Sequence, residues 1–328
     1  MAFINQSAYG ASPRPPGPPP LPLPRRIGYT PPPVQPLDMA ELAALGKLPL
    51  RARRLADALG IGGHASRRKG ASIEFADYRD YQMGDDLRRV DWRLYARTDR
   101  LHLREAHEET PLRVILLLDV STSMAYASAK DTLSKLDYAR AVLGALALLV
   151  RRQRDACGAG LISDDLAQWL PPSRSPVRLQ TVWGLLDKPP TGQTTNLARA
   201  LHTVLEIAPR RCLFVVASDF YEDPSALTPV IQRLRHERHD LIALQIADPA
   251  EVDFNFKDPS VFFDIETGRD VLLDPAAAAR DYRARFSAHR AAVTAACRDY
   301  GCEALELRTD EPPLDALRAC LARRDGQR

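Results

Sequence analysis

A carboxylate and two hydroxyls stand at every second position in Asp119-x-Ser121-x-Ser123. They follow directly on an uninterrupted apolar run, residues 114–118. An apolar run of this length predicts a strand that is buried on both faces, as in a parallel α/β sheet. Ligands of open α/β sheets bind at the carboxyl ends of such strands. Because hard oxygen atoms suit Mg²⁺, Mn²⁺ or Ca²⁺ better than Zn²⁺, the pattern indicates a divalent-cation site.

Two later segments supply further oxygen atoms. Residues 211–219 are a second apolar run that ends in Ser218 and Asp219, and residues 191–201 form a threonine-rich turn that opens an apolar-periodic helix. If both strands lie centrally in one parallel sheet, the polar side chains converge at one sheet edge. The candidate metal ligands are then Asp119, Ser121, Ser123, Thr195 and Asp219, with Thr194 as the alternative to Thr195. The competing interpretation is a strand followed by a helix start, where Asp and Ser are ordinary caps.

The elements that must position these residues alternate between strand and helix from residue 113 onward. Strands are expected near residues 113–119, 157–163, 166–170, 211–218, 239–246 and 302–307. Helices are expected near residues 131–153, 175–187, 195–208, 224–237, 275–300 and 312–324. Asp223-Pro224 and Asp274-Pro275 each place a capping Asp before a proline at the first helical position, which predicts a helix start. The alternation predicts a doubly wound, mostly parallel sheet in an α/β domain.

One segment interrupts the alternation. Residues 250–273 hold four phenylalanines and are expected to form a short hairpin that turns at residues 266–268. The two histidines of His236-x-x-His239 have a helix-face spacing, but they stand among charged residues. A solvated helix end is therefore predicted there, rather than a metal site.

The N-terminal third differs in composition from the rest. Residues 1–37 hold 12 of the 27 prolines and predict a disordered, proline-rich tail. Residues 38–60 predict an amphipathic helix with a break near Gly46 and Pro49. The predicted organisation is a tail over residues 1–37, a helix and charged extension over residues 38–110, and the α/β domain over residues 111–328.

Overall composition excludes several classes of protein. The chain has 328 residues and a formal charge of +3, which is too small to imply a nucleic-acid or membrane partner by itself. The longest apolar run, residues 141–150, is too short for a bilayer, which takes about 20 residues in a helix. Five cysteines without a CxxC pair predict neither a disulfide framework nor a zinc site. We therefore expect a cytoplasmic protein with no direct membrane span.

Residues 64–110 are dense in arginine, aspartate and aromatic residues. Between Arg51 and Arg104 there are 13 basic and 8 acidic residues, closely interleaved, whereas a nucleic-acid surface has fewer acids among its basic residues. We therefore expect no nucleic-acid partner. The pattern favours an ion-pair network that packs this segment on the main domain, and a charged docking surface is the alternative. The predicted anchors are Trp92 and Tyr81, and the predicted ion-pair members are Arg88 and Asp91.

The same segment resembles a known bacterial family, domain of unknown function 58. The main string is Gly84-Asp85-Asp86-x-Arg88-x-Val90-Asp91-Trp92. Supporting matches are Arg68-Lys69-Gly70, Glu74-Phe75, Tyr78-Arg79, Tyr81, Ala96-Arg97 and the acidic stretch 105–109. The resemblance runs from about residue 67 to residue 219. It implies a von Willebrand factor A-like domain after the signature, in which the five candidate ligands resemble a metal-ion-dependent adhesion site.

The resemblance also implies partners. Members of that family are commonly paired with MoxR-type AAA+ ATPases, and many carry two N-terminal membrane helices, which this sequence lacks. A metal-dependent binding module is therefore expected, with Mg²⁺ or Mn²⁺ in the site and a MoxR-type ATPase or its client as partner. A Mg²⁺-dependent phosphohydrolase is the alternative. We do not expect catalysis, because the sequence contains no GxxxxGK[ST], GxSxG or HExxH string.

Overall fold

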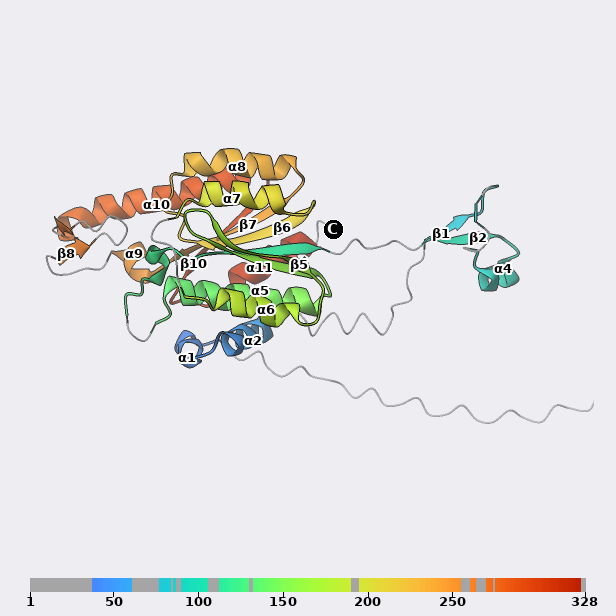
Figure 1. The fold of residues 1–328 in the computed structure, drawn as a ribbon, viewed down its shortest axis with the longest axis horizontal. Coiled ribbons are helices and arrows are strands. Elements are labelled where there is room, and N and C mark those ends of the chain that lie inside the picture. Colours follow the sequence, from blue (N-terminus) through green and yellow to red (C-terminus); the bar gives the residue numbers. More distant parts are fainter. Residues whose placement is uncertain are drawn as a thin grey trace, which may run out of the picture. The chain divides into compact units, whose positions relative to one another are not determined.

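The computed structural model describes most of the chain (Figure 1). The described residues are 37–60, 77–83, 85–86, 90–105, 112–129, 132–189, 195–254, 260–263, 270–273 and 275–325. Three features that the sequence predicts lie outside them: the proline-rich tail, the hairpin turn at residues 266–268 and the start of the family signature.

A six-stranded sheet forms the centre of the fold. Its strands are β3 (Arg113–Asp119), β4 (Ala156–Ile162), β5 (Leu166–Ser173), β6 (Cys212–Ser218), β7 (Asp240–Ala247) and β10 (Glu303–Arg308). The order across the sheet is β10-β7-β6-β3-β4-β5. Neighbouring strands run parallel except β5, which is antiparallel to β4 at the edge. The predicted doubly wound, mostly parallel α/β sheet is thus confirmed, with every predicted strand in place.

The register of β3 places the ends of two strands side by side. Leu118 lies opposite Ala217 of β6 and opposite Leu161 of β4. The chain leaves β3 for β4 on one side and later returns to β6 on the other. The strand order therefore reverses between β3 and β6, which is where open α/β sheets bind ligands. Asp119 and Ser218, the next residues of the two strands, meet at this point.

Helices cover both faces of the sheet (Figure 1). One face carries α5 (Lys135–Arg152), α6 (Arg178–Leu186) and α11 (Leu314–Asp325), and the other carries α7 (Leu197–Ile207), α8 (Pro224–His236) and α10 (Pro275–Asp299). Successive side chains of a strand point to opposite faces. Leu116 and Leu118 accordingly belong to one core, and Ile115 and Leu117 to the other. Each fully buried leucine contributes about 1.5–3 kcal/mol, which makes β3 a rigid support for its end.

The N-terminal helix breaks where the sequence predicts, into α1 (Met39–Ala44) and α2 (Leu48–Leu59). α2 packs on α5 at a close approach: a Cβ at Gly144 would stand 3.0 Å from the Cβ of Ala52. The Arg318 side chain of α11 donates to the carbonyl oxygens of Ala58 and Leu59 at the end of α2. These contacts join α2 to the core of the α/β domain.

Helix α5 and the segment after β7 differ from expectation. α5 begins at Lys135 rather than near residue 131, because the Ser134 side chain caps it by accepting from the Asp137 N–H. A short helix, α9 (Pro249–Asp253), follows β7 and was not predicted. Beyond it, β8 (Ser260–Phe263) and β9 (Asp270–Leu273) pair antiparallel, which confirms the strands of the predicted hairpin.

The charged extension contains regular structure of its own. β1 (Asp77–Asp80) and β2 (His102–Glu105) pair antiparallel, and α4 (Trp92–Thr98) lies between them in the sequence. Asp91 is the N-cap of α4 and accepts from two backbone N–H groups. Trp92 is 57% exposed, and α4 has no buried residue. The expected role of Trp92 as an anchor on the sheet domain stays a prediction. Arg88 lies outside the described residues, and the packing of this segment on the sheet domain stays a prediction.

Candidate functional site

The Asp119 carboxylate is the centre of a buried polar cluster at the carboxyl ends of β3 and β6. Its Oδ1 accepts from the Ser121 N–H at 2.9 Å and from the Thr195 hydroxyl at 2.9 Å. Its Oδ2 accepts from the Ser218 hydroxyl at 2.6 Å. Asp119 is fully buried. Side chains from three separate segments thus converge on one carboxylate, because the strand ends and the turn before α7 meet at the same edge.

The two serines are held by the turn that follows β3. Ser121 has extended backbone and precedes a short 3-10 helix, η3 (Thr122–Ala125), which contains Ser123. The tight turn places the two hydroxyl oxygens 3.1 Å apart. Both serines are buried. Their oxygen atoms therefore stand beside the Asp119 carboxylate, away from bulk water.

The turn after β6 is strained in a way that fixes Asp219. Phe220 adopts φ = 55°, a region that bulky residues rarely occupy. Two contacts hold it there: its N–H donates to the Ser218 hydroxyl at 3.0 Å, and its carbonyl oxygen lies 2.6 Å from Nε2 of His289. Strain of this kind costs about 1–3 kcal/mol and is concentrated at functional sites. Because Phe220 follows Asp219 directly, this turn fixes the backbone that carries the Asp219 side chain.

A buried lysine lies directly beside the cluster. Nζ of Lys135, the first residue of α5, lies 3.0 Å from Oδ2 of Asp219 and 2.7 Å from Oε1 of Glu251 in α9. It also stands 4.7 Å from the centre of the Tyr221 ring, a cation–π contact. The Lys135 side chain has 0% exposure and that of Glu251 only 14%. A lysine without solvent contact is rare unless it is paired.

The charges of these groups perturb one another. Burial, and then the negative charge of Asp219, raise the pKa of Asp119 to about 6. Burial lowers the pKa of Lys135, but the charges of Asp219 and Glu251 outweigh burial and raise it above its ordinary value. Lys135 is therefore charged at neutral pH. When ionised, the three carboxylates carry three negative charges against one ammonium, so the cluster has a net charge of −2.

The donor set fits a hard divalent cation. Within the described part of the chain, no cluster of three or more His, Cys, Asp and Glu side chains is placed to hold a metal ion. A metal at this edge would therefore depend on hydroxyl oxygens together with the two carboxylates. Mg²⁺ and Mn²⁺ accept such ligands and keep several waters. The net charge of −2 matches one divalent ion, and the residues that would hold it are Asp119, Ser121, Ser123, Thr195 and Asp219.

Most of the predicted site residues are brought together, but sequence reasoning missed two neighbours. Thr195 contacts Asp119, whereas the alternative Thr194 lies outside the described residues. Lys135 and Glu251 were not foreseen. The signal for Glu251 was present: Asp248 accepts from the Ala250 N–H, and Glu251 accepts from the Asp248 N–H, which is the capping box of α9.

Two other groups of the chain offer no competing chemistry. All five cysteines are buried and free, and burial raises the pKa of the Cys157 thiol to about 12. A protonated, buried thiol is a poor nucleophile. The predicted solvated helix end is wrong for His239, which is buried and accepts from the Cys212 N–H at 3.0 Å through Nδ1.

Among the helices that the structure describes, none combines the length and apolar character needed to cross a bilayer.

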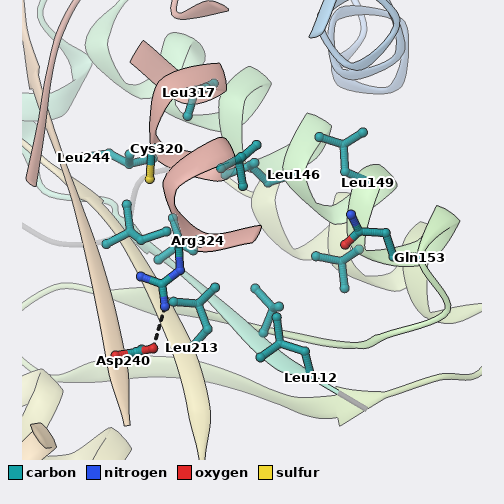
Figure 2. Close-up of a pocket in the computed structure, with 15 residues that line it drawn as sticks. Leu112, Leu146, Leu149, Gln153, Leu213, Asp240, Leu244, Leu317, Cys320 and Arg324 are labelled. Atoms are coloured by element: carbon teal, nitrogen blue, oxygen red, sulfur yellow. Dashed lines mark hydrogen bonds and ion pairs between the residues drawn. The ribbon is translucent and has the colours of Figure 1, made fainter. Parts of the chain in front are cut away.

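An apolar cavity lies at the opposite end of the sheet from the Asp119 cluster (Figure 2). It has a volume of about 240 Å³ and opens at the amino ends of β3, β6 and β7, between α5 and α11. Its walls are mostly leucine, valine and isoleucine, and the Arg324–Asp240 ion pair stands among its lining residues (Figure 2). Among its described lining residues, Asp240 is the one carboxylate, and none carries a hydroxyl. The polar edge of the sheet, rather than this cavity, is therefore the candidate functional site.

Comparison with known proteins places the chain in a family. Residues 77–295 match the family model described as "Protein of unknown function DUF58". The chain is 32% identical over 292 residues to "Uncharacterized protein Rv1480" of Mycobacterium tuberculosis (strain ATCC 25618 / H37Rv). That alignment covers 87% of this chain and 90% of the relative.

Two solved structures show a distant likeness to this chain. BatB, a conserved hypothetical protein from Bacteroides thetaiotaomicron, is 15% identical with a TM-score of 0.39, and the match covers 65% of this chain and 98% of BatB. The SpRpn10 VWA domain is 12% identical with a TM-score of 0.37, covering 63% of this chain and 94% of that domain. The strand order, rather than these scores, defines the fold.

Proposed function

The chain belongs to the DUF58 family, and from that premise we propose that it is a metal-dependent protein-binding module. The observation that carries the proposal is the convergence of two carboxylates and three hydroxyls at the switch point of the sheet. The Asp119 carboxylate, held by hydrogen bonds from Ser121, Thr195 and Ser218, is positioned before any ligand arrives.

The chemistry of the donor set suits capture of an acidic side chain. A bound Mg²⁺ or Mn²⁺ would supply a Lewis-acid position for a carboxylate oxygen of a partner. Ser121, Ser123 and Thr195 would contribute neutral oxygens, which leave more positive charge on the ion than additional carboxylates would. Ser121 and Ser123 are buried, so a partner would have to approach the ion from the side of Thr195, which is half-buried.

The proposed partner is a MoxR-type AAA+ ATPase or a client that such an ATPase remodels, in the cytoplasm. The partner would present an Asp or Glu to the site. A metal-dependent phosphohydrolase is the competing function, and it needs an attacking group and a phosphate-binding base. Lys135, the described cation beside the cluster, is fully buried and already paired with two carboxylates, so it is not placed to hold a phosphate.

The metal half of the proposal is tested by calorimetric titration of Mn²⁺. The wild-type protein is expected to bind one ion weakly, and Asp119→Ala is expected to abolish binding. Asp165→Ala is the matched control, because Asp165 also accepts a threonine hydroxyl, that of Thr203 at 2.7 Å, but pairs with Arg199 outside the cluster. Unchanged affinity in Asp119→Ala would remove the site from consideration.

The partner half is tested by co-purification with the MoxR-type ATPase. The ATPase should co-purify with this protein in Mg²⁺, and EDTA should abolish the association. Ser121→Ala and Thr195→Ala should weaken the association without changing the melting temperature of the protein. Capture that persists in EDTA would place the docking surface elsewhere. Turnover of p-nitrophenyl phosphate that requires metal and disappears in Asp119→Ala would favour the phosphohydrolase instead.

A further inference from the structure

Lys135 joins the candidate metal site to a carboxylate that is not part of it. Its ammonium contacts Oδ2 of Asp219, one of the five proposed ligands, and Oε1 of Glu251, which is not among them. The second Glu251 oxygen accepts from the Asp248 N–H at 2.9 Å. The ammonium therefore sits between a metal-site carboxylate and a carboxylate that is anchored to the start of α9.

The surroundings leave the ammonium no other role. The Lys135 side chain has 0% exposure, so it cannot meet a substrate or a partner. The Tyr221 ring and hydroxyl cover it, with the hydroxyl oxygen 3.5 Å from Nζ. Asp248, the other buried carboxylate nearby, is occupied by the backbone N–H groups of Ser128 and Ala250. Among the residues that the structure describes, Asp219 and Glu251 are the carboxylates that pair with the ammonium.

We propose that Lys135 is the permanent internal cation of this site, which holds Asp219 in place without metal and sets how tightly the site binds a divalent ion. This rests on the proposed function and extends it to the control of metal affinity. The Lys135 ammonium beside Asp219 repels a second cation and partly neutralises the negative charge of the Asp219 carboxylate. Glu251 opposes this effect, because it shares the same ammonium.

Removal of Lys135 and removal of Glu251 are expected to change the metal affinity in opposite directions. Removal of the ammonium in Lys135→Met frees the full charge of Asp219, so Mn²⁺ should bind at least about tenfold more tightly, as expected for a unit charge a few ångströms away. Removal of the Glu251 charge in Glu251→Gln leaves the ammonium to Asp219 alone, so Mn²⁺ should bind more weakly. A glutamine keeps the acceptor for the Asp248 N–H, and α9 should be preserved.

The experiment is Mn²⁺ calorimetry of the full chain at pH 8, together with thermal unfolding with and without Mg²⁺. Without metal, Lys135→Met should have a lower melting temperature than the wild type. Saturating Mg²⁺ should raise the melting temperature of Lys135→Met by more than it raises that of the wild type. Tyr138→Phe is the matched control: Tyr138 lies on the same helix, is buried, and donates to the Glu311 carbonyl oxygen at 3.0 Å. It should lower the melting temperature without changing the response to metal.

Each outcome decides the proposal. A tighter affinity in Lys135→Met with a weaker one in Glu251→Gln supports it, and Glu251→Gln alone still tests it if Lys135→Met does not fold. Unchanged affinities, or weaker binding in both variants, would show that Lys135 only stabilises the fold, while the metal site itself would stand. Absence of Mn²⁺ binding in the wild type and in Lys135→Met would instead remove the metal site and both proposals with it.

Discussion

The two ends of the central sheet differ in how far their charged side chains are buried. At the carboxyl end, Lys135, whose side chain has 0% exposure, pairs with Asp219 and Glu251. At the amino end, Arg324 pairs with Asp240 at 2.6 Å beside the apolar cavity, where the Asp240 side chain is 43% exposed (Figure 2). The carboxyl end of the sheet therefore carries a buried charged cluster, whereas the amino end carries an apolar cavity and a partly solvent-exposed ion pair.

The difference in burial favours the carboxyl end of the sheet as the proposed binding site. Removing charges from water costs several kcal/mol per ion, and a well-packed apolar group often stabilises such a position as well as an ion pair does. The buried charges at the carboxyl end are therefore better explained by what they do to the Asp119 cluster than by stability. At the amino end, apolar packing supplies the stability and the ion pair is secondary.

The strongest test of this contrast is Lys135→Met in metal-free protein. The substitution leaves two carboxylates without their buried counter-ion, and breaking a buried pair costs about 3–5 kcal/mol. Urea denaturation in EDTA should show a loss of this size. A loss below about 1 kcal/mol would mean that the two ends do not differ in the way that their burial indicates.

The apolar end is tested by Leu317→Ala. Leu317 is buried in α11 and lines the cavity, so truncation enlarges an existing void and should cost about 2–5 kcal/mol in the free energy of unfolding. Mn²⁺ affinity should be unchanged, because the residue lies at the opposite end of the sheet. A shift in metal affinity larger than about twofold would show that the two ends are coupled.

A smaller effect is expected from His239 at the amino end. Burial lowers the pKa of this histidine below 6.5, and its neutral Nδ1 accepts from the Cys212 N–H. A folded-state pKa below the unfolded value means that the stability contribution is present above about pH 6.5 and is lost as the pH falls. Thermal unfolding between pH 7.5 and 5 should show this decline, and His239→Gln should flatten it. His236→Gln, which changes an exposed histidine of the same segment, is the control.

The smallest effect is expected from Arg324→Met. The Arg324–Asp240 pair is partly exposed, and exposed ion pairs contribute about 0–1 kcal/mol. The methionine retains apolar contact with the cavity. Urea denaturation should give a loss below about 1 kcal/mol that shrinks further in high salt. A loss as large as that of Lys135→Met would abolish the contrast between the two edges.

Local patterns in the sequence determine most of the fold. The apolar runs predicted the four inner strands β3, β4, β6 and β7, because a strand buried on both faces needs apolar side chains at nearly every position. Proline after a capping aspartate located the start of α8 at Pro224. The same rule applied to Asp248-Pro249 would have located α9, the helix that carries Glu251.

The sequence also determined the chemical nature of the site, since Asp119, Ser121 and Ser123 are near neighbours along the chain. Only the tertiary structure determines which residues from distant segments lie beside them. Lys135 meets Asp219 and Glu251, which are 84 and 116 positions away, because the start of α5, the end of β6 and α9 gather at one edge of the sheet. Local periodicity in the sequence does not predict these contacts. A lysine at a helix start is ordinarily expected to be solvated, and here it is buried because distant elements pack around it and exclude water.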